Sequence, residues 1–185
     1  MSLIDPEYQA QLQHLHNAGK FSHGLKAYKL VKPFIEMYQP ISLLDFGCGQ
    51  GALIQCVLEF HPGTVVAGYD PGSDTFYQMP TESFESVVST DALEHVEPQR
   101  LEETLNVLND KFTKYAFLRI ACYPAKKNLP DGRNAHLIVE TPDWWRKQLQ
   151  KYLQANIVNE CIQIVDKSAK WPHVTGHNYD VTLVK

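Results

Sequence analysis

The sequence has no uninterrupted apolar run of about 18 residues, the length that a membrane-spanning helix needs. Its first seven residues carry acids in place of the basic stretch and apolar core of a secretory signal. Lysine and arginine number 17 and the acids 21, which leaves a net charge of −4. Coating nucleic acid or an anionic membrane requires a basic surplus. We therefore expect a cytoplasmic protein with no membrane partner, for which nucleic acid is disfavoured beyond local contact.

Closely spaced metal-binding or disulfide-forming residues are also scarce. The four cysteines never form C-x-x-C and lie far apart: Cys48, Cys56, Cys122 and Cys161. Zinc sites favour paired ligands and disulfide frameworks favour shorter secreted chains, so we expect reduced, structural thiols. His173 and His177 lie four residues apart, but Asp180 is the only carboxylate close to them in sequence. We expect no metal.

The length of 185 residues favours about one domain. Short apolar runs predict strands at residues 41–46, 64–69, 86–89, 115–122, 161–166 and 179–184. Apolar spacing and composition predict helices over 7–38 with a break at 19–24, and over 52–61, 97–112 and 142–154. Strands that alternate with helices indicate a parallel sheet covered on both faces, and the last two strands indicate an antiparallel hairpin. The expected fold is a three-layer α/β domain.

Two segments leave alternatives open. Pro33 lies inside the apolar stripe of the second helix and predicts a kink or a new turn there, and Pro40 ends that helix. Residues 73–84 are ambiguous, with room for a very short strand at 75–78 and little helix.

The most informative segment joins the first predicted strand to the next helix. It reads Leu44-Asp45-Phe46-Gly47-Cys48-Gly49-Gln50-Gly51. Glycines here form a tight turn whose backbone can approach a ligand, at the strand ends where open α/β sheets bind ligands. Asp70 ends the next strand, where a carboxylate can accept hydrogen bonds from a ribose diol. Turn chemistry alone is the alternative interpretation for both features.

The details of this loop bear on which nucleoside ligand it would hold. A dinucleotide fingerprint is G-x-G-x-x-G, whereas residues 47–51 read G-x-G-x-G. Asp45, two residues before the first glycine, would repel a pyrophosphate and favours a cationic ligand. A dehydrogenase is therefore the weaker alternative.

Three motifs together resemble one family. They are D-x-G-C-G-x-G at 45–51, Y-D-P at 69–71 and L-E-H-V at 93–96. The motifs follow one another in this order and lie at the ends of these strands, as they do in class I S-adenosylmethionine-dependent methyltransferases. The chain is therefore similar to a small stand-alone member of that family. The resemblance implies a Rossmann-like methyltransferase fold, a mostly parallel sheet with a C-terminal antiparallel hairpin, and S-adenosylmethionine as the cofactor.

The resemblance also implies which residues bind the cofactor. They follow three of the predicted strands: Asp45, Gly47, Cys48, Gly49, Asp70, Pro71, Ser89, Thr90 and Asp91. Asp45 would face the amino group, Asp70 the ribose hydroxyls and Pro71 the adenine. Residues 89–91 would lie beneath the sulfonium, and His95 would pack or hydrogen-bond locally.

The resemblance further implies one methyltransferase domain over residues 1–185, with an N-terminal helical lid at 1–40 and a catalytic core at 41–185. Gly19 and Gly24 flank the break between the first two helices and would permit hinge motion. An ordinary helix–helix turn at 20–23 is the alternative.

One departure from the family concerns the adenine. Between Asp70 and Phe84 there are too few residues for the usual helix, strand and acidic loop that grip this ring. Either Phe76 and Met79 hold it by apolar contact, or cofactor binding is weakened. The second possibility keeps open a degenerate member that holds the cofactor without turnover, as a binding or partner subunit.

The acceptor is constrained mainly by what is missing. Residues 89–92 lack the N/D-P-P-Y/F/W sequence of base-modifying amino-methyltransferases, and 122–124 has the wrong order for a C5-cytosine nucleophile. Basic and aromatic residues in later loops suit a polar acceptor instead: Lys126, Lys127, Arg133, His136, Trp171, His173 and His177. We expect O- or N-methylation of a small polar acceptor, a sugar, glycan or other metabolite. His136 is the expected base, and Asp91 the second catalytic residue.

Overall fold

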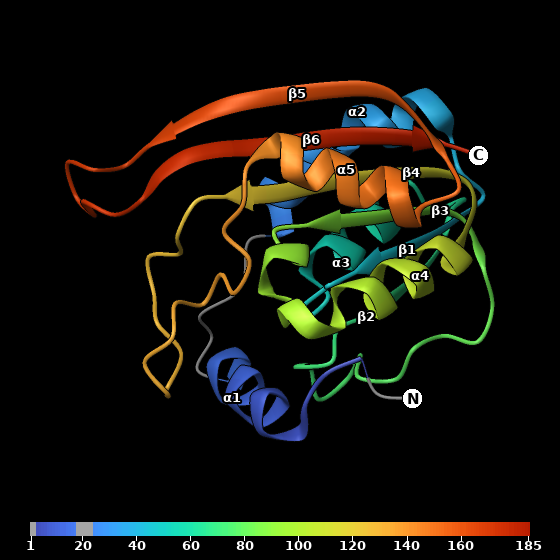
Figure 1. The fold of residues 1–185 in the computed structure, drawn as a ribbon. Coiled ribbons are helices and arrows are strands. Elements are labelled where there is room, and N and C mark those ends of the chain that lie inside the picture. Colours follow the sequence, from blue (N-terminus) through green and yellow to red (C-terminus); the bar gives the residue numbers. More distant parts are fainter. Residues whose placement is uncertain (1–2, 18–23) are drawn as a thin grey trace.

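The computed structural model describes residues 3–17 and 24–185, and these contain one six-stranded sheet, shown in Figure 1. Its strands are β1 (Ser42–Phe46), β2 (Val65–Tyr69), β3 (Phe84–Thr90), β4 (Phe112–Cys122), β5 (Asn156–Asp166) and β6 (Thr175–Val184). Their order across the sheet is β2-β1-β3-β4-β6-β5. The first four strands in this order pair in parallel, whereas β6 runs antiparallel to both β4 and β5. The expected mostly parallel sheet with antiparallel C-terminal strands is confirmed.

Helices cover both faces of this sheet (Figure 1). They are α1 (Pro6–Asn17), α2 (Gly24–Tyr38), α3 (Ala52–Phe60), α4 (Leu101–Lys111) and α5 (Pro142–Tyr152), with short 3-10 turns η1 (Leu93–His95) and η2 (Pro98–Arg100). Within β1, Leu43 joins the buried cluster of α2 and α3, and Leu44 joins the cluster of α4 and α5. Successive strand residues point to opposite faces, so a strand buried on both faces reads as a continuous apolar run.

Some elements differ in length from the sequence prediction. α4 begins at Leu101, four residues later than expected, because η2 occupies the preceding turn. β5 begins at Asn156, whereas the sequence predicts a strand only from residue 161. Asn156 pairs with Val184 of β6, although most side chains of β5 are exposed. α2 continues through Pro33 as one helix, so this residue does not start a new element.

Residues 71–83 form neither strand nor helix, so the structure has no strand at 75–78. Local hydrogen bonds occupy the backbone there instead. The Asp70 N–H donates to the Phe76 carbonyl at 2.9 Å, and the Ser73 hydroxyl accepts two following backbone N–H groups at 3.3 Å. Side-chain-to-backbone bonds of this kind compete with sheet pairing. β2 is consequently an edge strand of the sheet.

Three further observations bear on the sequence predictions. Within the described ranges, no helix combines the length and the hydrophobicity that crossing a membrane requires. The four cysteines are free thiols; Cys122 is buried, whereas Cys161 is exposed. The expected hinge segment at 19–23 lies outside the described residues.

Candidate active site

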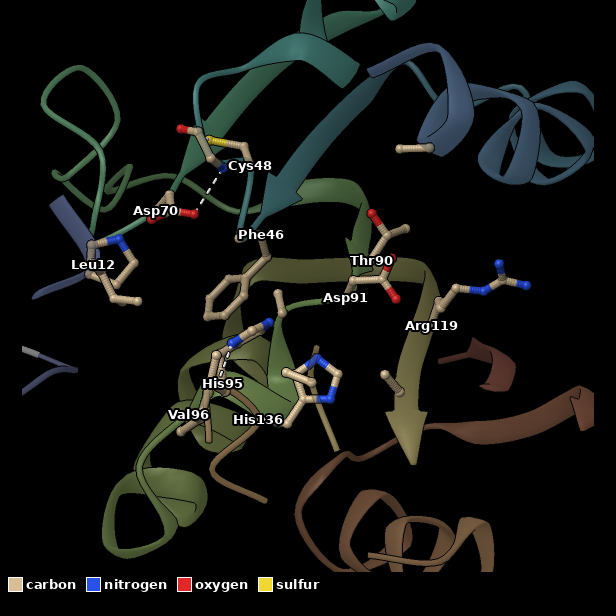
Figure 2. Close-up of a pocket in the computed structure, with 18 of the residues that line it drawn as sticks. Leu12, Phe46, Cys48, Asp70, Thr90, Asp91, His95, Val96, Arg119 and His136 are labelled. Atoms are coloured by element: carbon tan, nitrogen blue, oxygen red, sulfur yellow. Dashed lines mark hydrogen bonds between the residues drawn. The ribbon is translucent and has the colours of Figure 1, made fainter. Parts of the chain in front are cut away.

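The carboxyl ends of the four parallel strands open into a cavity of about 440 Å³ (Figure 2). All but one of the residues expected to bind a cofactor line it: Asp45, Gly47, Cys48, Gly49, Asp70, Pro71, Thr90 and Asp91. The exception is Ser89, whose hydroxyl is buried inside β3 and has no hydrogen-bond partner in the described part of the chain. His136, the expected base, also lines the cavity. The fold thus gathers residues that are far apart in sequence.

Backbone hydrogen bonds hold the β1–α3 loop against the end of β2. The N–H groups of Gly47 and Cys48 both donate to the Tyr69 carbonyl, at 2.7 and 3.1 Å. Gly47 has a φ of +86°, a left-handed conformation that favours glycine. A Cβ at this position would lie 2.3 Å from the Cβ of Ala92. Glycine is therefore required where the loop meets the turn after β3.

Asp70 fixes the same loop from the end of β2. Its two carboxylate oxygens accept the N–H groups of Gly49 and Gly72, each at 2.8 Å, and Figure 2 shows the bond to the glycine loop. A carboxylate offers about four lone-pair positions for hydrogen bonds. Asp70 can therefore accept hydroxyl groups of a ligand while it keeps both backbone bonds.

Asp45 brings a buried acid to this loop, with only 3% of its surface exposed. Burial, followed by the nearby charge of Asp70, raises the pKa of Asp45 to about 8. Within residues 3–17 and 24–185, no ion pair or hydrogen bond stabilises its carboxylate. A cationic group brought by a ligand would supply the missing stabilisation.

Phe76 and Met79 lie away from the cavity. The Phe76 ring packs behind the glycine loop, where a Cβ on Gly51 would come within 2.6 Å of it, and Met79 packs on the core between the sheet and α4 and α5. Apolar lining is supplied instead by Val96 and by residues of the N-terminal segment: Leu3, Ile4, Tyr8 and Leu12.

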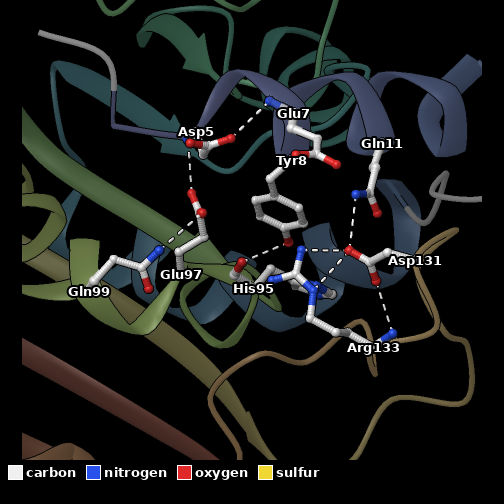
Figure 3. Close-up of polar contacts among 9 residues, drawn as sticks. All are labelled: Asp5, Glu7, Tyr8, Gln11, His95, Glu97, Gln99, Asp131 and Arg133. Atoms are coloured by element: carbon white, nitrogen blue, oxygen red, sulfur yellow. Dashed lines mark hydrogen bonds and ion pairs between the residues drawn. The ribbon is translucent and has the colours of Figure 1, made fainter.

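α1 forms a wall of the cavity and is fixed by polar contacts to segments far along the chain (Figure 3). The hydrogen bonds run from the Asp5 N–H to Glu97 Oε2 (2.9 Å), from the Tyr8 hydroxyl to the His95 carbonyl (2.8 Å), and from Gln11 Nε2 to Asp131 Oδ2 (3.0 Å). A further bond joins Gln9 Nε2 to the Pro71 carbonyl at 2.8 Å. α1 thereby links the turn after β2 to the turns after β3 and β4.

His136 and His95 line the cavity beside each other, with perpendicular rings whose centroids are 4.8 Å apart (Figure 2). Each ring uses Nδ1 on a backbone carbonyl, His136 on Tyr123 at 2.5 Å and His95 on Ala135 at 2.7 Å. Because a carbonyl only accepts, both Nδ1 atoms carry a proton, and Nε2 of the neutral ring is then an acceptor. Burial lowers the pKa of His136, which favours the neutral ring at pH 7. His95 packs on His136 and hydrogen-bonds to a residue 40 positions further along the chain, in place of the expected local bond, and it is also part of the site.

Glu94 is an acid at this site that the sequence analysis did not single out. It precedes His95 in η1 and is fully buried. Its Oε1 accepts the Ala121 N–H at 3.2 Å, while Oε2 has no hydrogen-bond partner among the described residues. Burial, followed by the charge of Asp91, raises the pKa of Glu94 well above its usual value. The available sequence cue was the Glu-His pair itself, just after a strand.

Positive charge collects in another part of the cavity lining. The lysines come from α2, from the loop after β4 and from the loop after β5: Lys26, Lys126, Lys127 and Lys167. Burial and then repulsion by Lys126 and Lys26 lower the pKa of Lys167, so these three amines lie within electrostatic range of one another. Arg119 is already neutralised by Asp180, through contacts of 2.6 and 2.5 Å. Lys26 and Lys167 were missed because they belong to separate segments with no motif.

The other basic and aromatic residues expected on the acceptor side do not line the cavity: Arg133, Trp171, His173 and His177. Arg133 pairs with Asp131 of its own loop at 2.7 Å. Trp171 lies beneath the Lys126 ammonium group, 4.0 Å from the ring centroid, so it supports a lysine that does line the cavity.

The chain matches no protein-family model and no curated protein by sequence. It does match solved structures. One is the 1,6-didemethyltoxoflavin-N1-methyltransferase of Burkholderia thailandensis, solved with 1,6-didemethyltoxoflavin and S-adenosylhomocysteine. The TM-score is 0.66 at 16% identity, over 100% of this chain and 92% of that one.

Two further solved structures share the fold. Magnesium protoporphyrin IX methyltransferase of Synechocystis, with S-adenosylmethionine bound, gives a TM-score of 0.56 at 14% identity, over 95% of this chain and 80% of that one. The third structure is a Nostoc punctiforme protein with a provisional O-methyltransferase assignment. Its TM-score is 0.60 at 10% identity, and the match covers 94% of this chain but only 60% of that protein. The chain therefore has the Rossmann-like fold of class I S-adenosylmethionine-dependent methyltransferases.

Proposed function

We propose that the chain is an S-adenosylmethionine-dependent methyltransferase whose acceptor is a small polar molecule with an anionic group. The observation that carries this proposal is the pair of acids at the glycine loop. Asp70 is held by two backbone N–H groups, and Asp45 is buried without a cation. They offer a carboxylate for a ribose diol and a carboxylate for an amino group in one cavity. The fold shared with methyltransferases supports the same assignment.

In this proposal Asp45 holds the amino group of the cofactor, Asp70 holds the ribose hydroxyls, and Pro71 lies beside the adenine. The remaining lining residues leave space along the cofactor or close the floor beneath its sulfonium: Gly47, Cys48, Gly49, Thr90 and Asp91. Ser89 supports that floor from inside β3. The cofactor supplies an electrophilic methyl group, so the protein's part is to orient the acceptor and remove its proton.

The acceptor binds where the lysines and histidines line the cavity. Lys26, Lys126 and Lys167 attract a phosphate or carboxylate group of a sugar, glycan or other metabolite. Neutral His136 takes the proton from the acceptor oxygen or nitrogen as the methyl group is transferred. Asp91 favours the protonated ring of His136 electrostatically. It directly follows β3 and has a left-handed backbone conformation, with φ +53°. Asp91 therefore stabilises the charge that His136 gains.

Cofactor affinity should depend on pH through Asp45. The Asp45 carboxyl of the free protein is protonated below about pH 8, and a cationic amino group requires the carboxylate. Binding should therefore weaken by up to about tenfold for each pH unit below 8. The ligand's amino group stays mostly protonated between about pH 6 and 7.5. Calorimetric titration with S-adenosylhomocysteine across this range should show affinity rising with pH.

Two variants decide whether Asp45 is responsible. Asp45→Asn removes the titrating carboxyl and should bind weakly with a nearly flat pH profile. Glu97→Gln changes another buried acid of the same cavity and should keep the slope of the unmodified protein. An unchanged slope in Asp45→Asn would remove Asp45 from the cofactor site.

The anionic group of the acceptor is tested with Lys167. Lys167→Gln should raise the acceptor KM by about tenfold or more, because a charged hydrogen bond contributes about 1.5–3 kcal/mol. Cofactor affinity should not change. The measurement is initial methylation rate over matched neutral and phosphorylated or carboxylated sugars. The control is Lys147→Gln on the exposed side of α5. Equal rates with neutral and anionic acceptors would contradict an anionic acceptor.

We propose that residues 1–185 form one domain and that its lid consists of α1 alone, and not of all residues from 1 to 40. α2 belongs to the layer that packs on α3 and the sheet, through buried residues such as Val31 and Phe34. α2 also lines the cavity through residues such as Lys26, but α1 packs outside that layer and is held at the cavity by the hydrogen bonds of Figure 3. Movement of α1 would open the cavity at the cost of the small buried cluster that Ile4 and Tyr8 form with the loop after β4, while the clusters on the two faces of the sheet would stay intact.

A second candidate function is cofactor binding without turnover. Among the described residues, no strand lies beyond β2 at its edge of the sheet, and residues 71–83 supply only a loop where the family resemblance implies further structure. Cofactor binding with no methylation of any neutral or anionic acceptor would favour this second function.

A further inference from the structure

Three potential metal ligands converge beside the lysine-lined part of the cavity. Glu94 and His95 come from η1, and His136 comes from the loop between β4 and α5. One ligand atom from each residue lies within 4.8 Å of the others. His95 and His136 line the cavity, so an ion held by this trio would be open to a bound molecule.

Both histidines are oriented as metal-binding histidines are. Each places Nδ1 on a backbone carbonyl, His136 at 2.5 Å and His95 at 2.7 Å. A second-shell bond of this kind fixes the tautomer and the ring orientation of a histidine ligand. Their perpendicular packing, at 4.8 Å between centroids, brings the two rings to one place from different segments.

Glu94 provides a carboxyl oxygen at the same place, which a bound cation would keep ionised. Its Oε1 is fixed by the Ala121 N–H at 3.2 Å, while Oε2 is buried and has no hydrogen-bond partner within the described chain. An unsatisfied buried carboxyl oxygen destabilises the fold, and a bound cation would remove this cost. The hydrogen bond to β4 thus orients Glu94 but leaves half of its carboxylate unused.

We propose that Glu94, His95 and His136 bind a divalent first-row transition metal ion, with Zn²⁺ as the reference ion. Two imidazoles and one carboxylate form the donor set of open, catalytic zinc sites, whereas Mg²⁺ and Ca²⁺ prefer oxygen ligands alone. Zinc bonds of about 2.0–2.2 Å require donor atoms about 3.4 Å apart. The trio therefore has to contract by up to about 1.4 Å when it binds the ion.

The position of this site gives the ion a function, and this step rests on the proposed function. An ion there would hold an acceptor hydroxyl by its oxygen and lower the pKa of that hydroxyl. The ion would replace His136 in activating the acceptor hydroxyl, and His136 would then be a metal ligand and not the general base. The methylated atom would be oxygen, and the hydroxyl proton would pass to solvent.

The test is a titration of the chain with Co²⁺ after dialysis against a chelator, without a histidine tag. We expect one Co²⁺ per chain with a visible d–d spectrum, displaced by Zn²⁺ but not by the same concentration of Mg²⁺. Glu94→Gln, which keeps an acceptor for Ala121, and His136→Ala should each weaken binding by at least about tenfold. His173→Ala removes a nearby histidine outside the trio and should leave the titration unchanged.

Circular dichroism of each variant separates loss of metal binding from loss of folding, and His136→Ala carries the test if Glu94→Gln does not fold. Absence of a d–d spectrum in the unmodified chain would overturn the site. So would a thiolate-to-cobalt band, or trio variants that titrate as the unmodified chain does. The titration uses neither cofactor nor acceptor, so its failure would leave the proposed methyltransferase function standing.

Discussion

Asp70→Ala should weaken binding of S-adenosylmethionine by about 1.5–3 kcal/mol, or about 10- to 150-fold. The Asp70 carboxylate accepts the N–H groups of Gly49 and Gly72 and is proposed to accept the ribose hydroxyls as well. Alanine therefore removes the ribose contact and releases the glycine loop that lines the cofactor site. Calorimetric titration at fixed pH measures the loss directly.

A nearby acid provides the control for this result. Asp74 lies on the same loop but is exposed and outside the cavity lining, so Asp74→Ala should bind the cofactor as the unmodified chain does. Asp70→Asn keeps one acceptor oxygen without the charge and should fall between the two. Equal affinity of Asp70→Ala and Asp74→Ala would reduce Asp70 to a turn residue.

Gly47→Ala should lower the free energy of unfolding by about 2–5 kcal/mol. A non-glycine residue at φ +86° costs about 1–2 kcal/mol, and overpacking typically costs a further 1–3 kcal/mol. The added Cβ would meet the Cβ of Ala92 at 2.3 Å, where neither backbone is free to withdraw. Urea unfolding followed by circular dichroism gives the difference in stability.

Gly63→Ala is the matched substitution. Gly63 lies in the turn between α3 and β2, and nothing approaches within 4 Å of the Cβ that alanine would add. Its stability should therefore stay within about 1 kcal/mol of the unmodified protein. If Gly47→Ala were as stable as Gly63→Ala, the close approach of the glycine loop to Ala92 would be wrong.

The central strands were predictable because both of their faces are buried. Val87 and Val88 of β3 belong to opposite core clusters, so the strand reads as an apolar run. β5 was predicted too short for the opposite reason. Residues 156–160 are mostly exposed and carry no apolar pattern, so their strand depends on pairing with β6, which sequence periodicity does not reveal.

The same distinction applies to the site. Asp45 and Asp70 were predictable because each belongs to a short motif at the end of its own strand. The meeting of Glu94 with His136 depends on the path of the loop after β4, and no local pattern encodes it. Lys26 likewise reaches the cavity only because α2 packs beside β1 and α3.

The most direct test of the proposed function is calorimetric titration with S-adenosylmethionine, S-adenosylhomocysteine and NAD in parallel. The site should bind the first two with micromolar affinity, because we propose that Asp45 holds their amino group and Asp70 their ribose. It should not bind NAD, because Asp45 gives a pyrophosphate no favourable charge and residues 47–51 read G-x-G-x-G, which departs from the dinucleotide fingerprint G-x-G-x-x-G. Binding of NAD, or no binding of either adenosyl ligand, would contradict the assignment of this cavity as a methyl-donor site.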